Sequence, residues 1–264
     1  MTGMTGGQAG AWERLFPLLL VPLLLGAAAA YLALTVRAGR RAPWPVARTA
    51  AFGTGLALLA VALLPPLGGA GHHPGFAGHM AQHLLIGMYA PLALVLGAPL
   101  TLTLRALPAA RARRLTAVLA SAPCRLLARP APAFLLATGS LVPLYCTPLY
   151  DWCAAHPWTH PLLHLHFLLA GCLWAHVVAG PDPLPARAAV RTRLVWLGGA
   201  IAVHALLSQA LYGGWGTVVH APVDDVRAGA QLMYYGGDIA ELLLAAALVS
   251  TWRPVRAARV RPVP

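Results

Sequence analysis

The sequence predicts an all-α membrane protein, a seven-transmembrane helix bundle with its N-terminus outside and its C-terminus in the cytoplasm. The 264 residues are 59% hydrophobic and only 10% charged, which leaves too little polar surface to cover soluble cores. Apolar runs of about 20 residues, long enough to cross a hydrocarbon core of about 30 Å, recur along the chain. The basic residues fall in alternate connections between these runs, as the positive-inside rule requires.

Seven apolar runs are expected to form the transmembrane helices. They lie near residues 16–36, 47–64, 79–104, 131–150, 158–180, 192–213 and 231–252. The first run is not expected to be a removable signal peptide, because its positive charges follow the apolar residues instead of preceding them. The chain is thus divided into a disordered tail (1–15), one transmembrane domain (16–252) and a basic cytoplasmic tail (253–264).

The net charge of +12 reflects topology and does not indicate nucleic-acid binding, which would need the basic residues on one soluble face. Arginines cluster in the first, third and fifth connections and in the C-terminal tail. Only Arg14 and Arg227 fall on the other side. This distribution predicts that the odd-numbered connections are cytoplasmic, with a secondary attraction to anionic lipid heads.

The third run opens with two histidines where a lipid-facing helix should avoid polar groups. Both His79 and His83 lie within about the first two turns from the outer face. Their spacing of four residues puts them on one side of the helix. We therefore expect their imidazoles to face a polar pocket inside the bundle.

The fifth run repeats this arrangement. His160 and His164 are again four residues apart, whereas His166 points about 200° away from His164 around the axis. The pair is assigned to the pocket and His166 is not.

The seventh run carries Asp238 and Glu241, which are neighbours on one face. From a start near Gln231, Asp238 would lie about 10 Å along the axis, in the outer half of the bilayer. An unpaired carboxylate there costs about 2.5–3.5 kcal/mol. No arginine is expected at that depth, so imidazoles or a metal ion are the expected partners. Glu241, one turn deeper, is interpreted as outer support for such a site or as a proton carrier.

Three helices are thus predicted to bring ionisable groups to a similar depth on the same side of the membrane. The predicted metal ligands are His79, His83, His160, His164 and Asp238.

The other histidines and the cysteines carry weaker signals. Three single histidines are interpreted as hydrogen-bonding partners between helices; they are His166, His176 and His204. The four cysteines have no CxxC spacing, which argues against a zinc ribbon or a redox centre and favours structural thiols; they are Cys124, Cys146, Cys153 and Cys172. No role is assigned to four outer histidines, namely His72, His73, His156 and His220.

Nucleophile-elbow, P-loop, zincin and dinucleotide-binding motifs are missing from the sequence. We therefore expect no enzyme activity.

Three segments together resemble the CtaG family of cytochrome c oxidase assembly factors. They are residues 79–85 with Leu96 to Pro99, the run from His156 to Trp174 with Gly180 to Pro183, and Ala230, Met233, Gly237 and Asp238 in the last helix. The resemblance covers about residues 17–250. The chain departs from the family pattern at Asp225–Val226, where an Asp-Gln pair is expected, so Asp225 is given no role.

The resemblance implies a multi-pass protein of the bacterial cytoplasmic (inner) membrane that is needed to form the oxidase's copper centre. Its partners would be cytochrome c oxidase subunits, an extracytoplasmic copper donor and the lipid bilayer, with no nucleic acid. The leading hypothesis is a metallochaperone that holds copper in the histidine and aspartate pocket, since imidazole suits copper and the order of divalent affinities favours it over zinc.

Two other functions remain open from the sequence. A haem-binding redox protein would use histidines from two helices as axial ligands. A zinc-dependent intramembrane hydrolase would need three ligands and an open water position, with Asp238 or Glu241 as base. Metal analysis together with an absorption spectrum separates the three.

Overall fold

The computed structural model describes residues 6–40, 42–65, 67, 75–156, 158–184 and 187–250, with side chains from Leu18 onward. All regular structure in these ranges is helical, which confirms the predicted all-α class. The α-helices are α1 (Gly6–Gly39), α2 (Val46–Leu63), α3 (Phe76–Leu84), α4 (Ala90–Leu96), α5 (Pro99–Ala106), α6 (Ala109–Leu119), α7 (Ala122–Leu127), α8 (Pro130–Phe134), α9 (Leu141–Cys146), α10 (Leu149–Ala155), α11 (Thr159–Ala179), α12 (Val190–Gly213) and α13 (Val223–Ser250). Two π-helical segments, η1 (Leu85–Tyr89) and η2 (Leu135–Gly139), interrupt the third and fourth spans.

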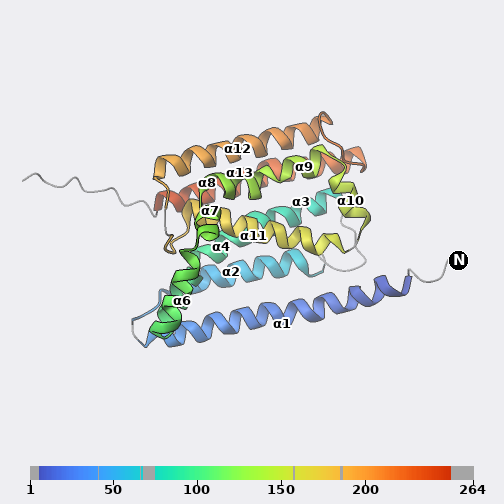
Figure 1. Ribbon diagram of the computed structural model, residues 1–264. Helices are drawn as coiled ribbons and strands as arrows, with labels where there is room; N and C mark the ends of the chain where they lie inside the picture. Colours follow the sequence, from blue (N-terminus) through green and yellow to red (C-terminus); the bar gives the residue numbers. More distant parts are fainter. Residues whose placement is uncertain are drawn as a thin grey trace, which may run out of the picture.

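In the described ranges, six stretches are long and apolar enough to cross a membrane, or seven if a bent pair counts as one span. The six are Leu18–Gly39, Val46–Leu63, Phe76–Ala106, Thr159–Ala179, Val190–Gly213 and Val223–Ser250. The seven predicted runs therefore all correspond to helices. Figure 1 shows these helices lying side by side, with α6 and α7 at one end of the bundle and α10 at the other.

The bent pair replaces the single straight helix that was predicted over residues 131–150. Pro130–Cys146 and Leu149–Ala155 meet at an angle of 83°. Thr147 between them is extended, with φ −130° and ψ 168°, because a residue that precedes a proline is pushed out of the helical region. The Thr147–Pro148 step thus ends α9 and turns α10 across the end of the bundle.

The outer boundaries of the first and last helices also differ from the prediction. α1 begins at Gly6, inside the segment predicted as a tail, although its apolar span begins only at Leu18. α13 begins at Val223, eight residues before the predicted start near Gln231. The predicted basic tail at residues 253–264 lies outside the described residues. The predicted orientation of the termini across the membrane stays a prediction.

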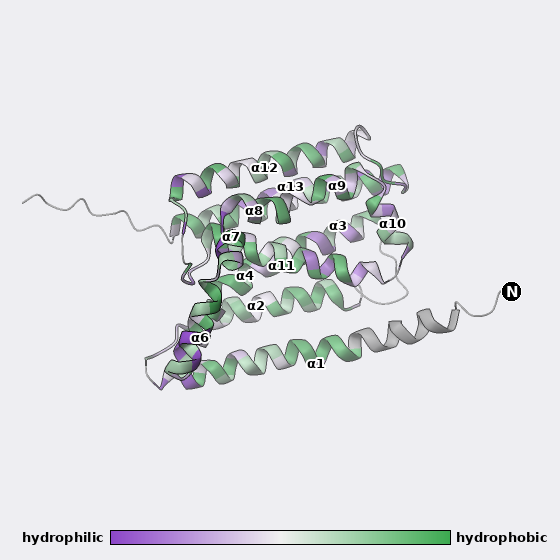
Figure 2. Ribbon diagram, viewed as in Figure 1, coloured by the Kyte–Doolittle hydropathy of each residue, from purple (hydrophilic) through white to green (hydrophobic). Residues whose placement is uncertain are grey.

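Apolar side chains cover the sides of the bundle, and polar ones gather at its ends. Figure 2 shows hydrophobic colouring along the long helices and hydrophilic colouring on α6. Large side chains such as Leu23, Val195 and Leu242 are exposed. Exposed apolar surface of this extent is unfavourable in water and favourable in hydrocarbon. Hydrophilic positions also interrupt the apolar colour on α3 and α11, in the interior of the bundle (Figure 2).

The carboxylate of Asp225 fixes the start of α3. Its oxygens accept hydrogen bonds from the backbone amides of Phe76 (2.6 Å) and Ala77 (3.1 Å). A side chain at Gly75 would collide with this carboxylate, so glycine is what allows the close approach. Asp225 therefore caps the helix that carries the first histidine pair, a role that the sequence did not reveal.

Asp182 plays the same part further along the third span. Gly97 and Ala98 break the helix between α4 and α5, and Ala98 has a positive φ of 51°. The restarted helix has its amides at Leu100 and Thr101 bonded to the Asp182 carboxylate, at 3.0 and 2.8 Å. Asp182 thus accepts hydrogen bonds from amides that lose their helical partners at the break.

Candidate functional site

The first histidine pair is buried inside the bundle, as the sequence predicts. His79 and His83 on α3 are only 2% and 4% exposed. The ring of His83 packs edge-on against Phe167 of α11, with ring centroids 4.6 Å apart. Gly171, further along α11, lets this helix approach η1 closely, because a side chain there would collide with the backbone of Gly87.

The second pair lies next to the first. His160 and His164 on α11 have ring centroids 4.6 Å apart. The ring of His160 lies 6.1 Å from that of His79 on α3. Charged forms of His79, His83, His160 and His164 would repel one another at these separations, so the cluster favours neutral rings or a metal ion whose charge is balanced by an acid.

A short hydrogen-bonded chain orients His79. Its Nε2 lies 3.0 Å from the hydroxyl oxygen of Tyr145 on α9. The Tyr145 hydroxyl donates in turn to the sulfur of Met80 at 3.8 Å. With its proton directed to Met80, the hydroxyl accepts from Nε2–H of His79, and the lone pair of His79 is then on Nδ1.

Several ring nitrogens in this cluster are buried and have no hydrogen-bond partner. They are Nδ1 of His79, both nitrogens of His83 and Nε2 of His164. Buried polar atoms are nearly always hydrogen-bonded in native structures, so such a group requires an explanation. Neutral imidazole nitrogens with free lone pairs are also the form that binds a metal ion.

The predicted aspartate lies about one turn beyond the first histidine pair along the bundle. Gly229 of α13 lies against Phe76 and Met80 of α3, and Gly236 lies against Leu84, so Asp238 is a few residues past the level of His83. The residue before it, Gly237, lies against the ring of His204. Asp238 is half-buried and lies close enough to Glu241 for their charges to repel. Its role as a ligand stays a prediction.

Glu241, and not Asp238, is the buried acid of this pair. It is 3% exposed, and its Oε2 has no partner. Sequence reasoning assigned it only a supporting role.

The structure adds two groups to the cluster that sequence reasoning missed. His204 on α12, interpreted as a packing residue, lies with its ring centroid 6.2 Å from that of His83. The ring of Tyr150 on α10 lies 4.9 Å from that of His79. No spacing within either helix marks these residues, because each joins the cluster only through tertiary packing.

Other polar residues hold helices together. Nε2 of His166 lies 3.1 Å from Oγ of Ser140, which agrees with its predicted role between helices. The Gln82 amide donates to the carbonyls of Ala62 (3.1 Å) and Leu67 (3.2 Å), so it closes the end of α2. All four cysteines are free thiols. His72 and His73 lie outside the described residues.

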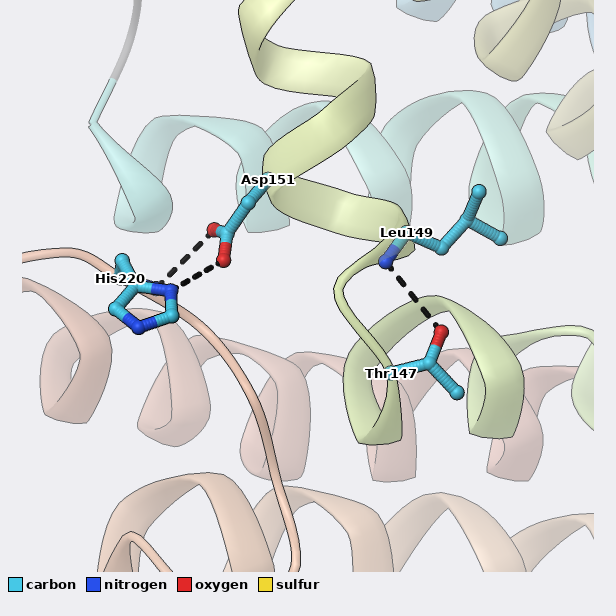
Figure 3. A network of polar contacts seen from close by, with 4 residues as sticks. All are labelled: Thr147, Leu149, Asp151 and His220. Carbon is cyan, nitrogen blue, oxygen red and sulfur yellow. Dashed lines mark hydrogen bonds and ion pairs between the residues drawn. The ribbon is translucent and has the colours of Figure 1, made fainter.

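A cavity of about 340 Å³ lies at the end of the bundle next to the cluster. It is lined by Phe76, Tyr150, Asp151, His220 and Asp225, among others. Figure 3 shows His220 bound to Asp151, with its Nδ1 2.6 Å from Oδ2 and its amide donating to Oδ1 at 3.1 Å. Phe76 and Tyr150 line this cavity and also pack against the ring of His79, so the cavity adjoins the histidine cluster through these two rings.

Across the described part of the chain, no three His, Cys, Asp or Glu side chains are arranged so that together they could hold a metal ion. Coordination by the positions as they stand is therefore limited to pairs of side chains.

Comparison with known proteins places the chain in a family. Residues 29–254 match the family described as cytochrome c oxidase caa3 assembly factor (Caa3_CtaG). Uncharacterized proteins of Mycobacterium bovis and Mycobacterium tuberculosis are each 32% identical over 254 residues, and one of Mycobacterium leprae is 35% identical over 201 residues. These alignments cover 87%, 87% and 71% of this chain but only 38%, 38% and 30% of the relatives, so the chain spans about two fifths or less of their length. No solved structure matches. The chain therefore belongs to the Caa3_CtaG family of cytochrome c oxidase assembly factors.

Proposed function

We propose that the protein holds copper transiently in the buried histidine cluster and supports its insertion into cytochrome c oxidase, in the cytoplasmic membrane of a bacterium. The observation that carries this proposal is the meeting of the histidine pairs of α3 and α11, together with the buried ring nitrogens of His79, His83 and His164 that have no hydrogen-bond partner. Family membership supplies the oxidase as the partner of the assembly step.

The spacing of His79 and His160 suits a cation held between two rings. A nitrogen lies about 1.1 Å from the centre of an imidazole ring, and metal–nitrogen bonds are about 2.0 Å. Two rings in line with one cation therefore have centroids about 6.2 Å apart. The observed separation is 6.1 Å. His83 and His164 stand beside this pair, and Asp238 would contribute charge or a further ligand after the helices adjust.

Copper fits this donor set better than the rival metals do. Imidazole is a ligand for copper in both oxidation states, and Cu(I), a closed-shell ion, can be held by as few as two ligands. A catalytic zinc site needs three protein ligands, and no such group exists among the described residues. A haem would need room for its macrocycle, whereas His83 packs directly on Phe167 at 4.6 Å.

The cavity beside His79 offers a route for copper from an extracytoplasmic donor. It opens at the end of the bundle where α10 lies, opposite α6 and α7 (Figure 1). The carboxylates of Asp151 and Asp225 face it and would attract a cation. Movement of Tyr150 or Phe76 would connect this mouth to His79.

The binding experiment uses purified protein in detergent, loaded anaerobically with Cu(I) against a competing chelator. The wild type is expected to retain copper and to show no Soret band. The quadruple variant His79→Ala, His83→Ala, His160→Ala, His164→Ala should lose it and should fail to support oxidase assembly in cells. Copper affinity should also fall as the pH is lowered, since protons compete for the imidazoles.

A matched control replaces two histidines outside the cluster and outside the cavity, His156→Ala and His166→Ala, and should retain copper. A wild type that takes up no copper, together with a quadruple variant that still assembles active oxidase, would refute the proposal.

A further inference from the structure

His204 of α12 and His83 of α3 form a second pair of neighbouring imidazoles. This pair lies about one turn further along α3 than the pair formed by His79 and His160. The ring centroids of His83 and His204 are 6.2 Å apart, and the ring planes differ by 30°. His204 is 2% exposed, and neither of its ring nitrogens has a hydrogen-bond partner. The same holds for both nitrogens of His83. Buried nitrogens without a partner require an explanation. Nδ1 of His204 lies against Gly237 and Nδ1 of His83 lies toward Gly87, which leaves the two Nε2 atoms as the pair that could share one ligand.

The separation of these rings matches that of a single cation bound between two imidazoles. An in-line arrangement gives centroids about 6.2 Å apart, which equals the observed value. Two-ligand coordination is also compatible with the lack of any three-ligand group among the residues that the structure describes.

Two residues of helix α13, Gly237 and Glu241, lie next to this pair or one turn from it. A side chain at Gly237 would collide with the His204 ring, so the ring lies directly on the backbone of α13. Glu241 is one turn further along the same face of the helix. It is buried, and its Oε2 has no partner. A monovalent cation with two neutral ligands keeps a full charge, and a buried charge needs a counter-charge nearby. Glu241 is the acid in place to supply it.

We propose that His83 and His204 form a second Cu(I) site, deeper in the bundle than the His79–His160 pair and neutralised by Glu241. This inference rests on the proposed copper function. Since His79 and His83 are one turn apart on α3, copper can pass between the pairs by ligand exchange. One Cu–N bond forms as another breaks, and the oxidation state does not change.

Stoichiometry tests the second site. Full-length protein in detergent, titrated anaerobically with Cu(I) against a chelator, should bind two equivalents. His204→Leu should bind one. His204→Met should restore the second equivalent, because a thioether is a soft ligand for Cu(I), whereas a purely structural role would treat Met and Leu alike. His166→Leu, which removes a histidine outside both pairs, is the matched control and should bind two.

Two further variants separate the sites and guard against misfolding. His160→Leu with His164→Leu should leave one equivalent, with the two-coordinate nitrogen signature in the X-ray absorption edge. Gly237→Ala should lose the deeper equivalent by displacing the His204 ring, whereas Gly199→Ala on α12, where a side chain meets open space, should keep both. Variants are compared only when they elute as the wild type does on size exclusion.

The outcomes distinguish the two proposals. The second site is overturned if the His204→Leu variant still binds two equivalents of copper. It is also overturned if the wild type binds only one equivalent and His204→Leu binds one as well. Either result leaves the proposed function standing. Loss of both equivalents in His204→Leu would overturn the separation of the sites. A wild type that binds no copper would remove the proposed function and this inference with it.

Discussion

Replacing Asp225 with alanine removes both acceptors that hold the start of α3. The carboxylate now bonds the amides of Phe76 and Ala77 at 2.6 and 3.1 Å. Loss of a side-chain cap costs about 0.5–2 kcal/mol. Because Asp225 is only half-buried, water can replace part of these bonds. We therefore expect a loss of about 1–2 kcal/mol in unfolding free energy, which corresponds to a fall in Tm of about 2–8 °C for a domain of this size.

The neighbouring acid provides a matched control. Asp224 is exposed, lies in the same first turn of α13 and makes no hydrogen bond within the described residues. Asp224→Ala removes the same charge and the same favourable helix-dipole interaction, about 0.3–1 kcal/mol, but leaves α3 capped. Asp225→Asn keeps one acceptor oxygen and should fall between the wild type and Asp225→Ala.

Thermal unfolding of the three variants in one detergent, followed by circular dichroism, measures the effect. The reasoning is refuted if Asp225→Ala unfolds at the same temperature as Asp224→Ala. It is also refuted if Asp225→Asn is as unstable as Asp225→Ala, since the lost stability would then come from charge and not from the cap.

Two further changes test the site and its packing. Tyr145→Phe removes the hydroxyl that orients His79. Outer partners of metal-binding histidines typically contribute about 10–100-fold to affinity, so copper should bind about that much more weakly in the chelator competition. An unchanged affinity would contradict the orienting role. Gly171→Ala would press a methyl group against the Gly87 carbonyl, and it should lower the unfolding free energy by about 1–3 kcal/mol. The control Gly198→Ala places its methyl group in open space and should change the unfolding free energy by less than about 1 kcal/mol. Equal effects of the two variants would show that α11 and η1 are not tightly packed.

The i, i+4 spacing of the histidines was the strongest local signal, and the structure keeps each pair on one helix face beside the other. That spacing is informative because two residues one turn apart share a face whatever the tertiary structure is. The meeting of His79 with His160 at 6.1 Å depended further on both helices entering from the same end, which the alternation of basic connections predicted.

The depth of Asp238 could not be predicted in the same way. The search for apolar runs finds the part of a helix that is compatible with hydrocarbon, and it misses a polar first turn. The first residues of α13 include the charged Asp224, Asp225 and Arg227 and are helical, with the two aspartates favoured at a helix N-terminus by the dipole. The helix therefore starts eight residues earlier than its apolar run, and a count from the apolar run misjudges where Asp238 lies along it.

His204 illustrates a different limit. It is a single histidine in an apolar helix, and its position relative to His83 depends on α12 lying against α13 at Gly237. No pattern within residues 190–213 encodes that contact. The bend at Thr147–Pro148, by contrast, was present in the sequence as a residue that precedes proline, and it could have been predicted.

The position of the third span depends on carboxylates from two other parts of the chain. Asp225 caps α3 at its start, and Asp182 caps α5 after the break at Gly97. Between them, η1 comes directly after Leu84, one residue beyond His83. A π-helical turn holds one more residue than an α-turn, so it rotates the next helical segment by about 100° relative to an uninterrupted helix.

This rotation gives the two halves of the span different neighbours. Before η1, α3 packs along α13, with Phe76 and Met80 against Gly229. After η1, α4 packs on α2 and α11. Because each half is held by its own carboxylate, the histidine half can adjust around a bound cation without moving the half that packs beyond the break. A rigid, uninterrupted helix would transmit such an adjustment along the whole span, so under the proposed copper function η1 and the two caps would let the histidine half adjust by itself.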